Sequence, residues 1–401
     1  MREGQTGAAG RRAPFLLFTE GFRPFFLAAG LWAAVAIVLW MVLLLRGAAL
    51  PSRFSPLAWH IHEMLFGFVL AAMAGFLLTA IPNWTGRLPV RGAPLALLAG
   101  LWLLGRISTL VSALLPLPLA IAADLAFPLA LAAVAAREVI AGRNWRNLPV
   151  VAIVSLFGAA DLLMHLEAAG VGLPPGIGWR LGIGLALALI ALVGGRIVPS
   201  FTRNWLARRG GARLPAPQDR FDRAALVLLD LGLLAWVAAP RGRIGGIVLL
   251  LAGAAHGWRL ARWRGFATMA EPLVLVLHLG YGWLALGVAL LGATMLDPAL
   301  PASAAVHALT VGAISTMIVA VTTRATRGHS GRSLVADRAT VVIYGLLTLA
   351  AVFRVAAALA GGEVLLLAAA GAWVGGFGLF CVHYGRMLTG PRLRRGDGSA
   401  V

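Results

Sequence analysis

The sequence predicts an all-α protein that crosses a membrane about twelve times. Apolar residues make up 60% of the chain, charged residues only 12%, and the mean hydropathy is +0.88. A soluble domain carries about 25% charged residues, so this composition excludes a water-soluble fold. Long apolar runs recur throughout the chain, and helices satisfy every backbone polar group inside lipid. The fold class is therefore a polytopic α-helical membrane protein.

Each apolar run is long enough to cross about 30 Å of hydrocarbon, which takes roughly 20 residues. We expect the whole of 1–401 to form one integral membrane domain, with flexible cytoplasmic tails at 1–15 and 391–401. The expected spans are about 24–45, 58–80, 93–113, 117–137, 148–168, 178–200, 222–239, 244–260, 270–292, 302–323, 339–360 and 363–386.

The arginines predict the orientation of these spans. All 34 basic residues are arginine, and the formal net charge is +19. Cytoplasmic loops of membrane proteins carry an excess of basic residues, and here the two termini and every second loop carry it. The arginines clearly on the other side are Arg46, Arg53, Arg180, Arg241 and Arg243. Both termini are therefore expected in the cytoplasm, and the charge indicates topology rather than nucleic-acid binding.

The chain also shows a repeat of four helices. A shift of 245 residues lays His62 on His307 and Gly67 on Gly312. Other matches, including Gly67 with Gly184 and Pro82 with Pro199, agree on a period of about 117–128 residues. The sequence thus predicts three pseudo-symmetric units, at about 20–146, 147–265 and 266–390. Transporters of the major-facilitator class consist of two six-helix halves, which this period does not fit.

Topology and repeat together divide the eight histidines into two belts. Near the outer face we expect His60, His62, His165 and His307, and toward the cytoplasm His256, His278, His329 and His383. Ionisable groups within spans usually face a functional interior, and imidazole is the commonest metal ligand.

His62 and His307 are the strongest candidates, because equivalent positions of two units both carry histidine. Two imidazoles from different helices, facing each other across a cavity, are what a six-coordinate haem needs. Residues i and i+2 lie about 200° apart on a helix, so His60 is expected to serve another ligand or only water. The apolar positions that follow His62 and His307 suit a porphyrin face, and equally suit ordinary helix packing.

Two further polar groups belong to the outer belt. Asp161 precedes His165 by one turn, so its carboxylate can orient that imidazole, as outer partners of metal ligands do. Glu63, next to His62, is a candidate proton carrier or a partner for Arg53 or Arg180.

On the inner side, His256, His278 and His383 are candidates for a second metal site, with Glu271 seven residues before His278.

Five segments of the chain carry a resemblance to a known family. They are LFTEGFRPFFLAAGLW (17–32), WHIHEMLFGFVLAAMAGFLLTAIPNWTGR (59–87), GGRIVPSFTRNW (194–205), HLGYGWLALG (278–287) and HALTVGAISTMIVAVTTRATRGHSGR (307–332). In their order and spacing these segments resemble the NnrS family of bacterial inner-membrane proteins. The resemblance implies haem, copper and a part in nitric oxide metabolism or protection against nitrosative stress. It leaves open whether the protein is a nitric-oxide-related oxidoreductase.

The sequence has a remoter resemblance to subunit I of the haem–copper oxidases and nitric oxide reductases. That fold also has twelve spans in three arcs, with haem-ligating histidines on spans 2 and 10, where His62 and His307 stand. Ala305 and Trp179 occupy positions where that family carries further histidines. Copper would then need other ligands, for which His60 and His165 are candidates.

Two alternative functions remain open at this stage. One is a twelve-helix transporter or exporter without a redox centre, in which the histidines relay protons. The other is a non-enzymatic haem or nitric oxide sensor.

Overall fold

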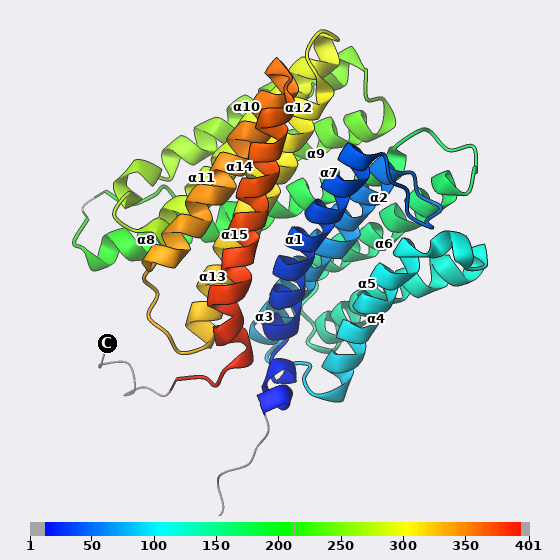
Figure 1. The fold of residues 1–401 in the computed structure, drawn as a ribbon. Coiled ribbons are helices and arrows are strands. Elements are labelled where there is room, and N and C mark those ends of the chain that lie inside the picture. The colour runs from blue at the N-terminus through cyan, green and yellow to red at the C-terminus, as the bar shows by residue number, and fades with distance from the viewer. Residues whose placement is uncertain (1–12, 212, 394–401) are drawn as a thin grey trace, which may run out of the picture.

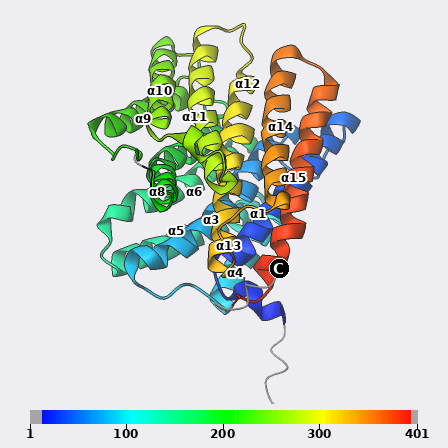
Figure 2. The same cartoon turned by 90° about the vertical axis from the view of Figure 1, so that its left-hand side faces the viewer.

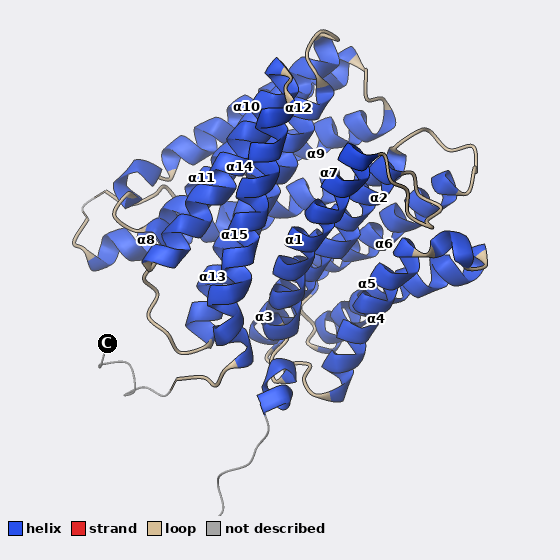
Figure 3. Cartoon of the chain, viewed as in Figure 1, coloured by secondary structure: helices blue, strands red, loops and turns tan. Residues whose placement is uncertain are grey.

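The computed structural model describes residues 13–211 and 213–393. These residues form helices joined by loops and turns, and no strand occurs among them (Figure 3). This confirms the all-α prediction. The expected flexible tails coincide largely with residues 1–12 and 394–401, which lie outside the described residues.

Twelve continuous helices run through the described part of the chain. They are α1 (Phe22–Arg46); α2 (Pro56–His62), η2 (Glu63–Val69) and α3 (Leu70–Thr85) as one helix; α4 (Ala93–Leu110); α5 (Leu117–Ala141); α6 (Leu148–Ala168); α7 (Ile177–Leu189), η5 (Ile190–Gly194) and α8 (Gly195–Arg208) as one; α9 (Arg220–Ala238); α10 (Arg243–Arg262); α11 (Pro272–Leu296); α12 (Ala302–His307), η7 (Ala308–Ile314) and α13 (Ser315–His329) as one; α14 (Arg338–Ala360); and α15 (Glu363–Thr389). Short 3-10 turns are η1 (Ala13–Phe18), η3 (Ser112–Leu114), η4 (Trp145–Asn147) and η6 (Gly265–Thr268).

Eleven of these helices are long and apolar enough to cross a membrane. The remaining one, α9, has a sufficient length of 19 residues but carries charged groups, including Asp222, Arg223 and Asp230. The finding confirms a multi-pass membrane protein, close to the expected twelve spans.

Local signals in the sequence set several helix ends. The Ser55 hydroxyl accepts a hydrogen bond from the Ala58 amide at 3.3 Å, and Pro56 follows as the first helical residue of α2. Asp337 caps α14 in the same way, through the Thr340 amide at 2.9 Å. Such caps satisfy amides that have no partner in the first turn of a helix.

The last helix closes the bundle against the first. α15 packs between α14 and α1, so the red and blue ends of the chain lie side by side (Figure 1). Arg23 of α1 reinforces this contact by donating to the carbonyls of Leu388 at 2.9 Å and Gly390 at 2.7 Å. Both described ends of the chain therefore lie at one end of the bundle, hereafter the terminal end (Figure 2).

Three helices contain a π-helical segment: η2, η5 and η7. These wider turns are rare and occur often at functional sites. They fall in the second helix of each expected unit, although the three-unit organisation itself stays a prediction. η2 follows directly on His62 and η7 directly on His307, so both histidines precede a change in helical winding.

Candidate metal centre and adjoining cavity

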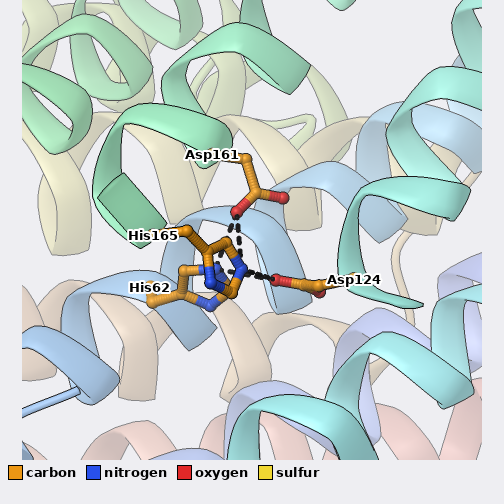
Figure 4. A group of neighbouring side chains, drawn as sticks. All are labelled: His62, Asp124, Asp161 and His165. Carbon is orange, nitrogen blue, oxygen red and sulfur yellow. Dashed lines mark hydrogen bonds and ion pairs between the residues drawn. The ribbon is translucent and has the colours of Figure 1, made fainter. Parts of the chain in front are cut away.

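Four buried side chains meet in the half of the bundle away from the terminal end. His62 comes from the last residue of α2, Asp124 from α5, and Asp161 and His165 from successive turns of α6 (Figure 4). His62 Nε2 lies 2.8 Å from Asp161 Oδ1 and 3.0 Å from Asp124 Oδ2, and His165 Nε2 lies 2.9 Å from Asp124 Oδ2. One ligand atom from each of the four lies within 4.8 Å of the others. We call this group the His–Asp cluster.

The donors of the His–Asp cluster fit a divalent transition-metal ion. Two imidazole nitrogens and two carboxylate oxygens form a mixed set of the kind that Cu²⁺ accepts in a tetragonal arrangement, and imidazole also suits Zn²⁺. Among the described residues, Asp161 Oδ2 is buried without a hydrogen-bond partner. A buried carboxylate oxygen without a donor is costly, and a cation would satisfy it.

A second ring of polar residues surrounds the cluster. Glu63 accepts hydrogen bonds from Trp32 Nε1 at 2.7 Å, from Arg106 Nη1 at 2.6 Å and from the Thr109 hydroxyl at 2.7 Å. Arg106 Nη2 donates to Asp124 Oδ1 at 2.6 Å. Arg106 thus joins Glu63 to the cluster. Glu63, Arg106, Thr109 and Asp124 are buried, whereas Trp32 is half-buried.

The charges of this network do not balance with neutral histidines. Ionised Glu63, Asp124 and Asp161 contribute three negative charges, whereas Arg106 contributes one positive charge. An uncompensated charge in a membrane interior is strongly unfavourable. With all three carboxylates ionised, two positive charges are missing, and one divalent cation, two imidazolium groups or protons on the carboxylates themselves would restore the balance.

The hydrogen bonds of His62 are compatible with metal ligation. Its Nδ1 lies 3.2 Å from Glu63 Oε1, while its Nε2 faces the two aspartates. If Nδ1 carries the proton and donates to Glu63, Nε2 presents a lone pair to a metal. A carboxylate behind the imidazole is the usual outer partner of a ligating histidine.

The local sequence after His62 explains how Glu63 reaches this position. Gly67, within η2, lies so close to Trp32 that an added Cβ would stand 2.4 Å from its indole nitrogen. The missing side chain lets Trp32 approach and donate to Glu63. The Gly67 carbonyl also accepts a hydrogen bond from Trp102 Nε1 at 3.0 Å. Glycine therefore permits close packing at the turn that follows His62.

A cavity of about 330 Å³ adjoins this region, and its lining includes His60, His307 and Arg354. The rest of its lining is mostly apolar and aromatic, with side chains from η2 and η7. His60 stacks on Trp40, with ring centroids 4.6 Å apart, and its Nδ1 is buried without a partner among the described residues. His307 Nδ1 donates to the Ser303 carbonyl at 2.7 Å, which leaves Nε2 as the nitrogen with a free lone pair.

The structure does not bring His62 and His307 together across one cavity. His307 lines the cavity, but its partner there is His60, and His62 is enclosed in the His–Asp cluster. The physical reason is that α2 already begins at Pro56, so the two histidines of α2 point about 200° apart. The repeat pairs His307 with His62, whereas the cavity lining contains His307 and His60, which lies two residues before His62 on α2.

The other predicted partners are also rearranged. Asp161 Oδ1 lies 3.8 Å from His165 Nε2 and 2.8 Å from His62 Nε2. It therefore contacts His62 more closely than His165, its expected partner. Glu63 pairs with Arg106, not with Arg53 or Arg180. Those two arginines donate to backbone carbonyls, Arg53 to Ser112 and Leu115 and Arg180 to Pro175 and Val237.

The three histidines expected to form a second metal site occupy separate places among the described residues. His256 Nδ1 lies 2.8 Å from the Tyr281 hydroxyl, His278 Nε2 lies 2.8 Å from the Thr202 hydroxyl, and His383 Nε2 donates to Asp337 at 2.9 Å. Glu271 accepts from the Leu273 amide and caps α11. The described residues thus contain one metal-ligand cluster, at His62, and the expected inner site is not assembled.

Sequence reasoning missed Asp124 and left Arg106 without a role. Asp124 is a single carboxylate within the apolar run LPLAIAADLAFPLALAA (117–133). A carboxylate in the middle of a span is itself a functional signal, and so is an arginine such as Arg106. What the sequence lacks is any local spacing that links these two residues to His62.

A model of the NnrS family, described as NnrS protein, matches residues 16–392, nearly the whole chain. The chain belongs to the NnrS family. The matched residues of this NnrS-family member contain the complete His–Asp cluster, the second ring around it and the histidine-lined cavity. Among curated proteins, none matches the chain.

Proposed function

We propose that this NnrS-family protein binds haem in the cavity at His60 and His307 and a copper ion in the His–Asp cluster. We further propose that it acts in the nitric oxide response of a bacterial inner membrane. The observation that carries the proposal is the buried cluster of His62, Asp124, Asp161 and His165, whose network lacks two positive charges when its carboxylates are ionised. Membership of the NnrS family supports the link to nitric oxide.

The residues around the cavity support haem as its ligand. His60 and His307 come from two different helices, and each has a ring nitrogen that no described protein group uses. Arg354 is the cation that would pair with a haem propionate. Bound haem would supply an iron centre for ligand binding or electron transfer, and the chain's part is to hold it with imidazoles inside an apolar lining.

The His–Asp cluster supports copper for a different reason. Its four donors come from three helices and are surrounded by hydrogen bonds that fix their orientation. Glu63 holds His62 at Nδ1, and Arg106 holds Asp124 at Oδ1. A set of ligands oriented before the metal arrives favours one coordination geometry. His60 and His62 belong to the same turn of α2, so the two proposed sites adjoin.

The test is the metal and haem content of purified protein. Expression with sufficient haem and copper should give a Soret band and about one copper ion per chain. Titration with nitric oxide should then shift the Soret band if the iron has an exchangeable position. A colourless protein that contains neither haem nor copper would contradict the proposal, and proton-coupled transport by that metal-free protein would favour a transporter instead.

A further inference from the structure

A groove at the terminal end of the bundle has the chemistry of a phospholipid site. It lies between α4 and α5, at the edge of the bundle (Figure 1). Its volume is about 790 Å³, and the linker 86–91 forms one of its walls. Its charged lining consists of Arg87, Arg91, Arg137 and Glu138.

Glu138 gathers two of the arginines at the base of this groove. The Arg137 guanidinium donates to Glu138 Oε1 through Nε at 2.9 Å and Nη2 at 2.6 Å, and Arg87 Nε donates to Oε2. Each of these guanidiniums keeps further N–H groups that Glu138 does not use. Arg91 forms no ion pair within the described residues. The groove therefore has an excess of two positive charges.

Beyond these charged residues, along α4 and α5, the lining of the groove is apolar. Leu97 and Leu101 of α4 and Ala130 and Val134 of α5 line it. Leu97 is 65% exposed, as expected for a side chain that faces lipid. The groove thus offers cations at the level of the headgroups and an apolar channel along the acyl chains.

We propose that this groove binds an anionic glycerophospholipid of the leaflet on the terminal side. Basic pockets between membrane helices bind phosphate headgroups, and each arginine near an anionic lipid adds about 1 kcal/mol. The apolar walls exclude a free inorganic anion as the natural occupant, because such an ion makes no contacts with apolar side chains. The excess positive charge selects an anionic over a zwitterionic headgroup.

The position of the groove suggests what the lipid would stabilise. The linker 86–91 leads from α3 to α4, and the Gly92 amide at its end donates to the Phe18 carbonyl at 2.8 Å. A lipid bound against this linker would hold together the ends of α3, α4 and α5 that lie at the terminal end of the bundle. This proposal is independent of haem and copper, because the groove shares no lining residue with the cavity or the cluster.

The experiment compares lipids and variants in the full-length protein. Detergent-purified protein is titrated with dioleoyl phosphatidylglycerol, dioleoyl phosphatidylcholine or glycerol phosphate, and binding is followed by native mass spectrometry and by the midpoint of thermal unfolding. We expect phosphatidylglycerol to bind at least tenfold more tightly than phosphatidylcholine. Arg91→Gln should weaken that binding about fivefold, the equivalent of one arginine contact. It leaves both Glu138 ion pairs in place, so folding should not change.

The matched control is Arg208→Gln, which removes an exposed arginine outside the groove. It should bind phosphatidylglycerol as the unmodified protein does. Equal binding of the two lipids, equal stabilisation by glycerol phosphate alone, or equal affinities of Arg91→Gln and Arg208→Gln would each overturn the proposal.

Discussion

His60 and His62 stand two residues apart on α2, yet they serve different parts of the molecule. His60 lines the cavity that also contains His307 and Arg354, whereas His62 lies within 3.0 Å of both Asp124 and Asp161. An i, i+2 pair on a helix faces nearly opposite directions. One turn of α2 therefore contributes a histidine to each of two adjoining sites.

This arrangement predicts that the two histidines have separable roles. His62→Ala should lose copper and keep the Soret band, whereas His60→Ala should lose the Soret band and keep copper. His329→Ala, which removes a histidine outside both sites, should keep both. Metal analysis and absorption spectra of the three purified variants measure this. Loss of haem from His62→Ala at unchanged fold would contradict the assignment of His60 to the cavity.

Asp124 offers a test of the metal site that barely changes its shape. Asp124→Asn replaces an oxygen by a nitrogen of similar size and removes a negative charge that faces both His62 and His165. We expect copper affinity to fall by more than about tenfold, in line with substitutions around metal ligands. Competition with a chelator of known affinity measures the change. An unaltered affinity would exclude Asp124 as a ligand.

Arg106 should be important for stability, because it is the cation that forms ion pairs with both Glu63 and Asp124. Arg106→Met leaves both carboxylates buried without their partner, which costs about 3–5 kcal/mol in comparable buried pairs. Chemical unfolding in detergent measures the loss. The double variant Arg106→Met with Glu63→Gln should recover part of it, because it removes one of the uncompensated charges. No recovery would show that Arg106 acts mainly through packing.

Gly67 should tolerate no side chain. Gly67→Ala places a Cβ against Trp32, and overpacking of this kind costs about 1–3 kcal/mol. It should also displace the Trp32 indole from Glu63, so indole fluorescence should change along with stability. Gly100→Ala on α4 is the control, because an added Cβ there meets no atom within 4 Å. If both substitutions have the same effect, the close approach of Trp32 is not important.

Asp337, just before α14, should give the protein a stability that acid removes. Burial alone would raise the pKa of Asp337, but hydrogen bonds from Arg327 and Thr340 outweigh it and hold the pKa well below its usual range. Because the pKa of Asp337 is lower in the folded state, the ionised carboxylate stabilises the protein at pH values above its unfolded-state pKa of about 3.9. This contribution disappears as the pH falls through the folded-state pKa.

Asp337→Asn keeps an acceptor for the Thr340 amide but removes the charge. Since the carboxylate is partly exposed, we expect a loss of only about 0.5–1 kcal/mol near neutral pH. Unfolding midpoints of the two proteins should converge as the pH drops below about 4. A difference that stays constant between neutral and acid pH would contradict this account.

The sequence by itself determined the class of the molecule and the places where its helices lie. Hydropathy indicates which segments can cross lipid, because a helix of about 20 apolar residues satisfies its own backbone there. α9, expected as the span 222–239, is the exception, because Asp222, Arg223 and Asp230 make it less apolar than the eleven other helices. Single histidines and carboxylates within apolar runs marked His62, Asp161, His165 and His307 as functional candidates, because such groups are costly in lipid without a role.

Only the tertiary structure decided which of these groups meet. Both histidines lie within α2 and point in nearly opposite directions, and the packing of α2 turns His60, rather than His62, toward the cavity with His307. Asp124 reaches His62 and His165 because α5 packs beside α6 and the end of α2, and Arg106 reaches Glu63 from α4. These contacts join residues 18 to 99 positions apart in the chain. Helical periodicity relates residues within one span. It does not encode how separate helices pack, and that packing brings the side chains of the His–Asp cluster to a common point.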